Sequence, residues 1–130
     1  MFFILHILLM AISTLGIIGG ISAAMFFRKK RDWLIIHKYL NSFSLLGMST
    51  GIITACIYIY SENGEHIDGF HQLTGLTAFN FAVATLLLGL YQFKAKNKLA
   101  VRATHRWLGR FSLLLFLTAI TLGLILINIF

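Results

Sequence analysis

Four long apolar blocks, separated by short polar connections, constrain this chain more than any other feature. They cover residues 2–27, 33–60, 70–93 and 107–130, and their only charged residues are Lys38 and Arg110. About 20 apolar residues suffice for a helix to cross a hydrocarbon core of roughly 30 Å. Because lipid leaves no water for backbone groups, a spanning segment of this kind must be helical. The sequence therefore predicts an all-α integral membrane protein, a four-helix up-down bundle that forms a single domain over residues 1–130.

The charge distribution predicts how the bundle lies in the membrane. The net charge is +7, and all eleven Lys and Arg fall within residues 28–38 and 94–110. The connection over residues 61–69 has three acidic residues and no Lys or Arg. Since cytoplasmic connections collect Lys and Arg, both termini and residues 61–69 are expected on the non-cytoplasmic side. This clustering favours topology and contact with anionic lipid over nucleic-acid binding.

Four histidines stand near the starts of the four apolar blocks. They are His6, His37, His71 and His105, separated by 31, 34 and 34 residues. In an alternating bundle this spacing predicts two pairs, with His6 and His71 near the outer surface and His37 and His105 near the inner surface. Helices 1 and 3, like helices 2 and 4, are diagonal neighbours in such a bundle. Two imidazoles facing each other across the bundle axis would suit haem, which accepts imidazole as an axial ligand.

The glycines follow the histidines at two sets of offsets. In the first two blocks they come ten and fourteen residues after the histidine, and in the last two they come four and eighteen residues after it. We expect such glycines to leave room for a bulky ring, although small residues also let membrane helices approach each other. The glycines predicted to contact the cofactor are Gly16, Gly20, Gly47, Gly51, Gly75, Gly89, Gly109 and Gly123.

The remaining residues that could take part in chemistry point to few other functions. Cys56 is the only cysteine, and no C-x-x-C-H motif is present, so a haem would not be attached covalently. A scaffold whose histidines bind zinc or sense pH is an alternative. Zinc usually takes three or four protein ligands, however, which two histidines per level do not supply. The role of His66, in the acidic connection, stays open.

Four short motifs, in this order and spacing, resemble those of the cytochrome b561 domain, a transmembrane di-haem electron-transfer module. They are HILLM at residues 6–10, HKYLN at 37–41, HQLTG at 71–75 with Gln92 downstream, and RATHRWLGR at 102–110. The resemblance covers nearly the whole chain. It implies two haems b per chain, held by helices 1 and 3 and by helices 2 and 4.

The resemblance implies that electrons pass between a donor on one membrane face and an acceptor on the other. No residue is predicted to be catalytic, and Arg106 is expected near a haem propionate. The donor could be ascorbate, a quinol or a redox partner protein. Alternatives are a haem-bearing subunit of a larger oxidoreductase and a non-redox membrane scaffold. We expect a prokaryotic plasma membrane as the location, and homodimer formation is left open.

Overall fold

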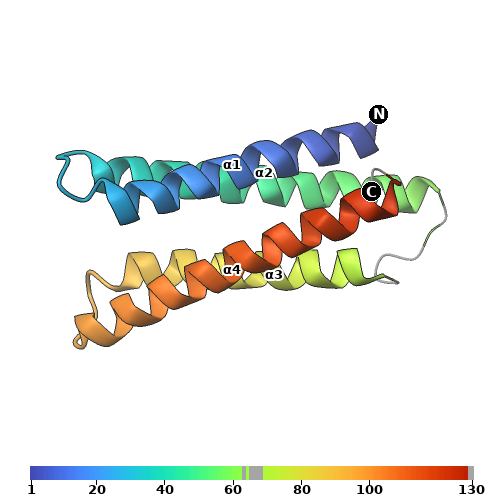
Figure 1. Ribbon diagram of the computed structural model, residues 1–130. Coiled ribbons are helices and arrows are strands. Elements are labelled where there is room, and N and C mark those ends of the chain that lie inside the picture. Colours follow the sequence, from blue (N-terminus) through green and yellow to red (C-terminus); the bar gives the residue numbers. More distant parts are fainter. Residues whose placement is uncertain (63, 65–68, 129–130) are drawn as a thin grey trace. The chain divides into compact units, whose positions relative to one another are not determined.

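Four α-helices make up the regular structure of the chain. In this computed structural model, which describes residues 1–62, 64 and 69–128, they are α1 (Phe2–Phe26), α2 (Trp33–Ser61), α3 (Phe70–Tyr91) and α4 (Lys98–Leu126) (Figure 1). No strand occurs among these described residues. The prediction of an all-helical chain is confirmed.

Each helix is long and apolar enough to cross a membrane. The shortest, α3, has 22 residues, which at 1.5 Å per residue gives roughly 33 Å. The mean hydropathy of the most apolar stretch ranges from 1.6 in α2 to 2.3 in α1. Large apolar side chains also lie on exposed surfaces, among them Ile12, Phe43 and Leu114. Such surfaces suit a lipid environment, and the chain is an integral membrane protein by this measure.

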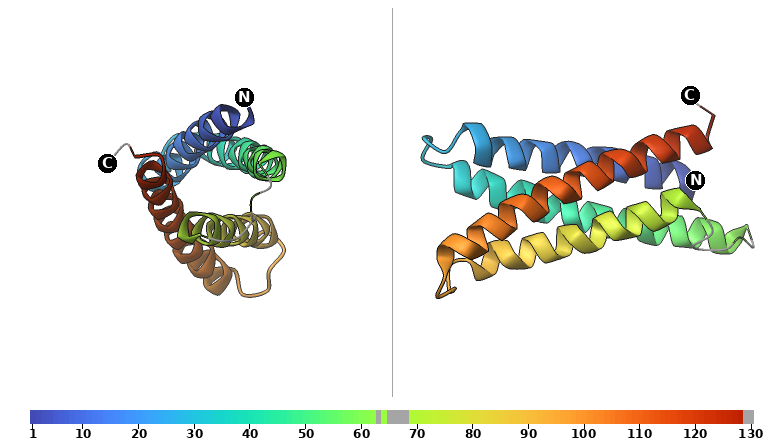
Figure 2. Two further views of the ribbon diagram at one scale, coloured as in Figure 1. Left: turned by 90° about the vertical axis from the view of Figure 1, so that its right-hand side faces the viewer. Right: turned by 60° about the horizontal axis from the view of Figure 1, so that its bottom comes forward.

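The helices pack in two pairs. Helix α1 packs against α2, and α3 packs against α4, each pair forming an antiparallel hairpin (Figures 1 and 2). The chain divides accordingly into two compact units, residues 1–66 and 67–130. The first hairpin includes a ring contact between Phe3 and Tyr58 at 5.5 Å, and the second an edge-to-face contact between Phe81 and Phe111 at 5.1 Å. How the two hairpins assemble into one bundle stays a prediction.

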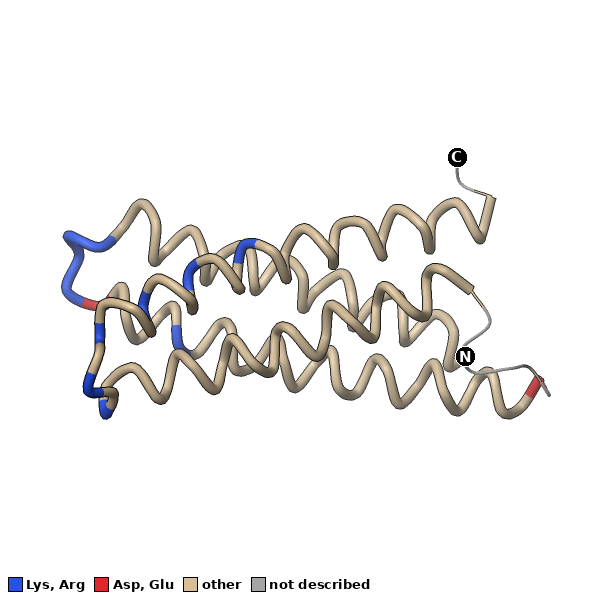
Figure 3. Tube along the Cα trace, turned by 90° about the horizontal axis from the view of Figure 1, so that it is seen from below, with Lys and Arg blue, Asp and Glu red and all other residues tan. Residues whose placement is uncertain are grey.

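Lys and Arg residues gather where the two helices of each hairpin are connected (Figure 3). We call this the basic end of the hairpin and the opposite one the far end. In the first hairpin the connection contains Arg28 to Arg31, and in the second the Lys and Arg run from Lys94 to Arg110. Glu62 follows the last residue of α2, at the far end of the first hairpin. Which membrane face each end meets stays a prediction.

The start of α4 differs from its prediction. The helix begins at Lys98, nine residues before Trp107, because Asn97 caps it and accepts a hydrogen bond from the Ala100 N–H at 3.1 Å. Lys, Leu, Ala and Arg all favour helix, so helical structure continues beyond the apolar block that set the predicted boundary. As a result, His105 lies about two turns inside α4 rather than at its start. The bounds of the other three helices agree with the prediction to within two residues.

Candidate functional site

The four histidines share one arrangement. Each is half-buried, and each ring places its Nδ1 atom against a backbone carbonyl of the facing helix in its own hairpin. His6 reaches the carbonyl of Gly51 at 2.8 Å, and His37 reaches that of Gly20 at 2.8 Å. In the second hairpin, the Nδ1 atom of His71 lies 2.8 Å from the carbonyl of Ala119, and that of His105 lies 2.9 Å from the carbonyl of Thr85.

The four acceptor carbonyls obey a single rule. Each belongs to the residue fourteen positions after the other histidine of the hairpin: Gly20, Gly51, Thr85 and Ala119. Fourteen residues span about 21 Å of helix. The two histidines of a hairpin are therefore about 21 Å apart along its axis. His37 and His105 lie toward the basic ends of their hairpins, and His6 and His71 toward the far ends.

The backbone contact fixes the proton on each ring. A carbonyl oxygen can only accept, so Nδ1 must donate, and in the neutral imidazole Nε2 then carries the lone pair. Ligand histidines in metal sites have this arrangement, in which the second N–H orients the ring and raises the basicity of the ligating nitrogen. The chemistry of each ring therefore fits an axial ligand of haem, with Nε2 as the ligating atom.

His37 has additional neighbours on its own helix. The amide nitrogen of Asn41 donates to the His37 carbonyl at 2.6 Å and lies 3.2 Å from Nδ1. Because Nδ1 donates its proton to the Gly20 carbonyl, it cannot also accept from the Asn41 amide. The hydrogen bond that Asn41 makes is therefore the one to the His37 carbonyl. The indole of Trp33, one turn away, has its ring centre 6.5 Å from that of His37. Asn41 stands in the second motif, four residues after the histidine, but nothing in the sequence singles it out as a contact of His37.

The glycines of the first hairpin lie against the facing helix. A Cβ added at Gly16 would collide with the Ser44 hydroxyl, and one at Gly47 would collide with the Ser13 hydroxyl. Both serines are buried and stand seven residues after a histidine, so the two contacts are equivalent by position. These glycines let α1 and α2 approach closely.

Gly20 and Gly51, whose carbonyls accept from the histidine rings, each face a larger residue of the other helix. A Cβ at Gly20 would collide with the Asn41 amide, and one at Gly51 would lie 3.0 Å from the Met10 sulfur. The larger residue thus stands four positions after one histidine, and the glycine fourteen positions after the other. Contact between the glycines of this hairpin and a cofactor stays a prediction.

In the second hairpin the sizes are reversed. Gly75 and Gly109 come four residues after their histidines and face Ala119 and Thr85, with added Cβ atoms 4.0 Å and 3.4 Å from the facing side chains. This exchange accounts for the offset of fourteen residues in the first half of the sequence and of four residues in the second. Both hairpins pair a small residue with a larger one at the same place, but they put the small one on opposite helices.

The last two glycines meet the histidine rings themselves. A Cβ at Gly89 would lie 2.9 Å from the Cε1 atom of His105, and one at Gly123 would lie 2.9 Å from that of His71. Neither glycine could carry a side chain without moving the ring. The eighteen-residue offset marks this contact, and the ring that the glycines accommodate here is that of a histidine. Contact between the glycines of this hairpin and a cofactor stays a prediction.

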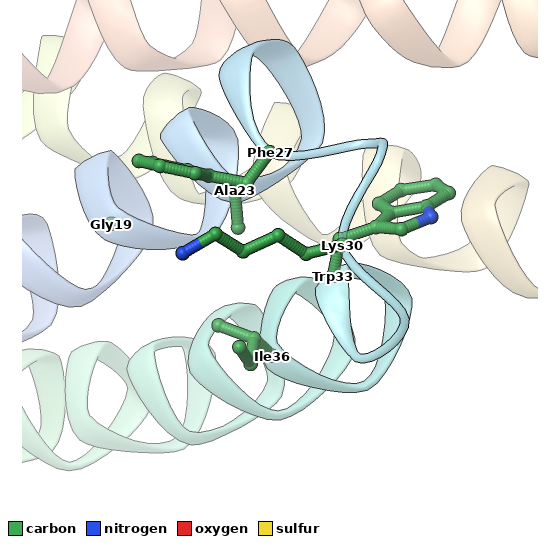
Figure 4. A pocket seen from close by; sticks show the side chains of 6 residues that line it. All are labelled: Gly19, Ala23, Phe27, Lys30, Trp33 and Ile36. Atoms are coloured by element: carbon green, nitrogen blue, oxygen red, sulfur yellow. The ribbon is translucent and has the colours of Figure 1, made fainter.

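Cations and aromatic side chains line the basic ends. Arg106, next to His105, is exposed, and the Arg110 guanidinium lies 5.3 Å from the centre of the Trp107 ring. In the first hairpin a shallow pocket is largely apolar, and the side chain of Lys30 extends into it between the two helices (Figure 4). The pocket is lined by Gly19, Ala23, Phe27, Lys30, Trp33 and Ile36. Contact between Arg106 and a propionate stays a prediction.

Other candidates for ligation are sparse in the part of the chain that the structure describes. Within residues 1–62, 64 and 69–128, no group of three or more His, Cys, Asp or Glu side chains is arranged to hold a metal ion. Cys56 is exposed. His66 lies outside the described residues.

The fold and the histidines together define a class, an all-helical membrane protein with backbone-anchored imidazoles suited to haem. A family model described as "Eukaryotic cytochrome b561" matches residues 2–130. The chain belongs to the cytochrome b561 family, whose members are haem b proteins of membrane electron transfer. Comparison with curated proteins and with solved structures found no match. Because the matched family is described as eukaryotic, the predicted prokaryotic plasma membrane receives no support.

Proposed function

We propose that this chain carries electrons one at a time across a membrane through two haems b. One haem would be held by His6 and His71 at the far ends of the hairpins, and the other by His37 and His105 at the basic ends. The observation that carries the proposal is the shared anchoring of the four rings. In every case Nδ1 donates to the carbonyl of the residue fourteen positions after the other histidine of the same hairpin. Each hairpin therefore has one Nε2 with a lone pair at each of two levels.

The protein's own contribution is to hold and orient the ligands. Each backbone carbonyl keeps the proton on Nδ1, so no proton has to move at the ligand when an electron passes. The same bond increases electron donation from Nε2, which favours the ferric state. When bound, haem b supplies an iron that alternates between the ferric and ferrous states. The helices supply a setting of low polarity, which together with nearby charge tunes the potential of the iron.

The basic ends suggest where the electron donor or acceptor binds. Lys38 directly follows His37, and Arg106 directly follows His105, so cations adjoin both ligands at that level. They can pair with haem propionates and attract an anionic reductant. Ascorbate is the donor class that the family suggests, and a quinol or a redox partner protein is an alternative. The basic ends are expected on the cytoplasmic side, in contact with anionic lipid head groups.

Histidine variants combined with visible spectroscopy test the ligand pairs. In reduced-minus-oxidised spectra, we expect His6→Ala and His71→Ala to remove one and the same low-spin component. His37→Ala and His105→Ala should remove the other. His66→Ala serves as the control and should leave the spectrum unchanged. If His6→Ala and His37→Ala removed the same component, the histidines would be paired within hairpins and the proposed arrangement would be wrong.

A second function is a haem-bearing subunit of a larger oxidoreductase. The same ligands would serve, but the electron donor would be a protein rather than a small molecule. Purification from the native membrane distinguishes the two functions. A partner recovered in a fixed ratio, together with no reduction by ascorbate or quinol, would favour the subunit. A chain that binds no haem when haem is plentiful would instead be a non-redox scaffold.

A further inference from the structure

Gly89 and Gly123 hold equivalent places in the second hairpin. Each comes eighteen residues after the histidine of its own helix, and five helical turns bring it back to the face on which that histidine lies. The group that it meets there is the histidine of the other helix. An added Cβ would lie 2.9 Å from Cε1 and 3.1 Å from Nδ1 of His71 at Gly123, and 2.9 Å and 3.3 Å from those of His105 at Gly89.

This contact falls where it can control the ring. Cε1 lies between the two ring nitrogens, one of which donates to the backbone while the other is the proposed ligand. A group in close contact with Cε1 would therefore rotate the ring about the Cβ–Cγ bond of the histidine. This rotation would strain the hydrogen bond from Nδ1. In the first hairpin, the positions eighteen residues after the histidines are occupied by Ala24 and Ala55. Glycine at this offset is thus confined to the second hairpin.

We propose that Gly89 and Gly123 are positioning residues that set the orientation of one axial imidazole each. The proposal rests on the proposed function, since it assumes that His71 and His105 ligate haem. It assigns the two glycines in a crossed manner. Gly89 is on α3, the helix of His71, but it acts on the haem held by His105. Gly123 is on α4, the helix of His105, but it acts on the haem held by His71.

The test uses Gly123→Ala and Gly89→Ala in the full-length, haem-loaded protein. Electron paramagnetic resonance of the ferric form gives a low-spin signal whose g values depend on the orientation of the axial ligands. A redox titration gives each haem its midpoint potential. The two haems are first distinguished by which signal is lost in His71→Ala and which in His105→Ala.

We expect each variant to change one haem only. Gly123→Ala should shift the g values of the signal that His71→Ala removes, and Gly89→Ala those of the signal that His105→Ala removes. The midpoint potential of the affected haem should rise, because a weakened Nδ1–H hydrogen bond makes the imidazole a poorer electron donor to iron. Gly19→Ala is the matched control, since a Cβ there meets only the end of the Leu40 side chain, at 3.3 Å, and should leave both signals unchanged.

Three results would overturn the proposal. Both signals could shift together in each variant, as a general change of packing would require. The affected signal could be the uncrossed one. The third result is that neither signal shifts in either variant while both haems remain bound. If the variants fail to fold, nuclear magnetic resonance of the reduced wild-type protein decides, because a cross-peak must join Hε1 of His71 to Hα of Gly123. A wild-type protein that binds no haem would refute the proposed function instead, which keeps the two failures distinct.

Discussion

The two hairpins anchor their histidines in the same way but bring their helices together differently. In both, Nδ1 donates to the carbonyl of the residue fourteen positions after the other histidine of the same hairpin. In the first hairpin, glycine stands at that acceptor position and a larger residue faces it. In the second, glycine faces the acceptor, and further glycines accommodate the rings. The comparison shows that the same anchoring of the histidine rings is reached with either arrangement of small and large residues where the two helices cross.

An exchange of residues between the hairpins gives the largest expected effect. Gly20 faces Asn41 in the first hairpin, and Thr85 faces Gly109 at the equivalent place in the second. Gly20→Thr alone should displace α1 from α2, break the contact between His37 and the backbone, and cost about 1–3 kcal/mol of stability. Haem content at the basic-end site and thermal unfolding would measure both effects.

The double variant Gly20→Thr with Asn41→Gly reproduces the second hairpin's arrangement. We expect it to recover most of the lost haem and stability, because the facing residue no longer occupies the space that threonine needs. Asn41→Gly alone is the matched control. If the double variant were no better than Gly20→Thr, the two hairpins would not be interchangeable at this position, and the comparison would fail.

The positive charges beside the basic-end histidines are expected to give an effect of intermediate size. They should change the midpoint potential of the haem rather than the amount of haem bound. Lys38 and Arg106 each follow a basic-end histidine, whereas Ile7 and Gln72 follow the far-end histidines. Because positive charge favours the reduced haem, the basic-end haem should have the higher midpoint potential. Lys38→Gln and Arg106→Gln should each lower it and leave the far-end haem nearly unchanged. A basic-end haem of lower potential in the wild-type protein would contradict this account.

The smallest expected effect concerns a single hydrogen bond between helices. The buried Ser112 hydroxyl donates to the Ala78 carbonyl at 3.2 Å and joins α4 to α3. Ser112→Ala should cost only about 0.6 kcal/mol, the average for such bonds in membranes. Haem content should stay unchanged, and unfolding in mild detergent would measure the loss. A loss of haem in Ser112→Ala would assign this serine a role beyond packing.

The sequence predicted the features that depend on pattern. Long apolar blocks are sufficient to predict four helices long enough to span a membrane. The spacing of the histidines predicts two levels, and the contacts place the two histidines of each hairpin at different levels along its axis. Their depths in the membrane stay a prediction. The start of α4 was wrong because hydropathy marks the lipid core and not the end of the helix. Asn97, an ordinary capping residue, was the signal that could have corrected it.

The sequence could not indicate what the glycines face. Their offsets are visible, but an offset does not state whether the missing side chain would meet a serine, a histidine ring or a cofactor. The backbone acceptors were likewise invisible, since any residue has a carbonyl and Ala119 and Thr85 carry no distinguishing side chain. Only the way in which two helices cross selects these atoms.

The number of haems b per chain tests the central claim most directly. It is obtained by quantifying haem and protein in the purified wild-type chain after expression with ample haem. We predict two haems per chain, both low-spin, because each of two levels offers one anchored imidazole from each hairpin. One haem per chain, or none, would contradict the claim that all four histidines act as ligands.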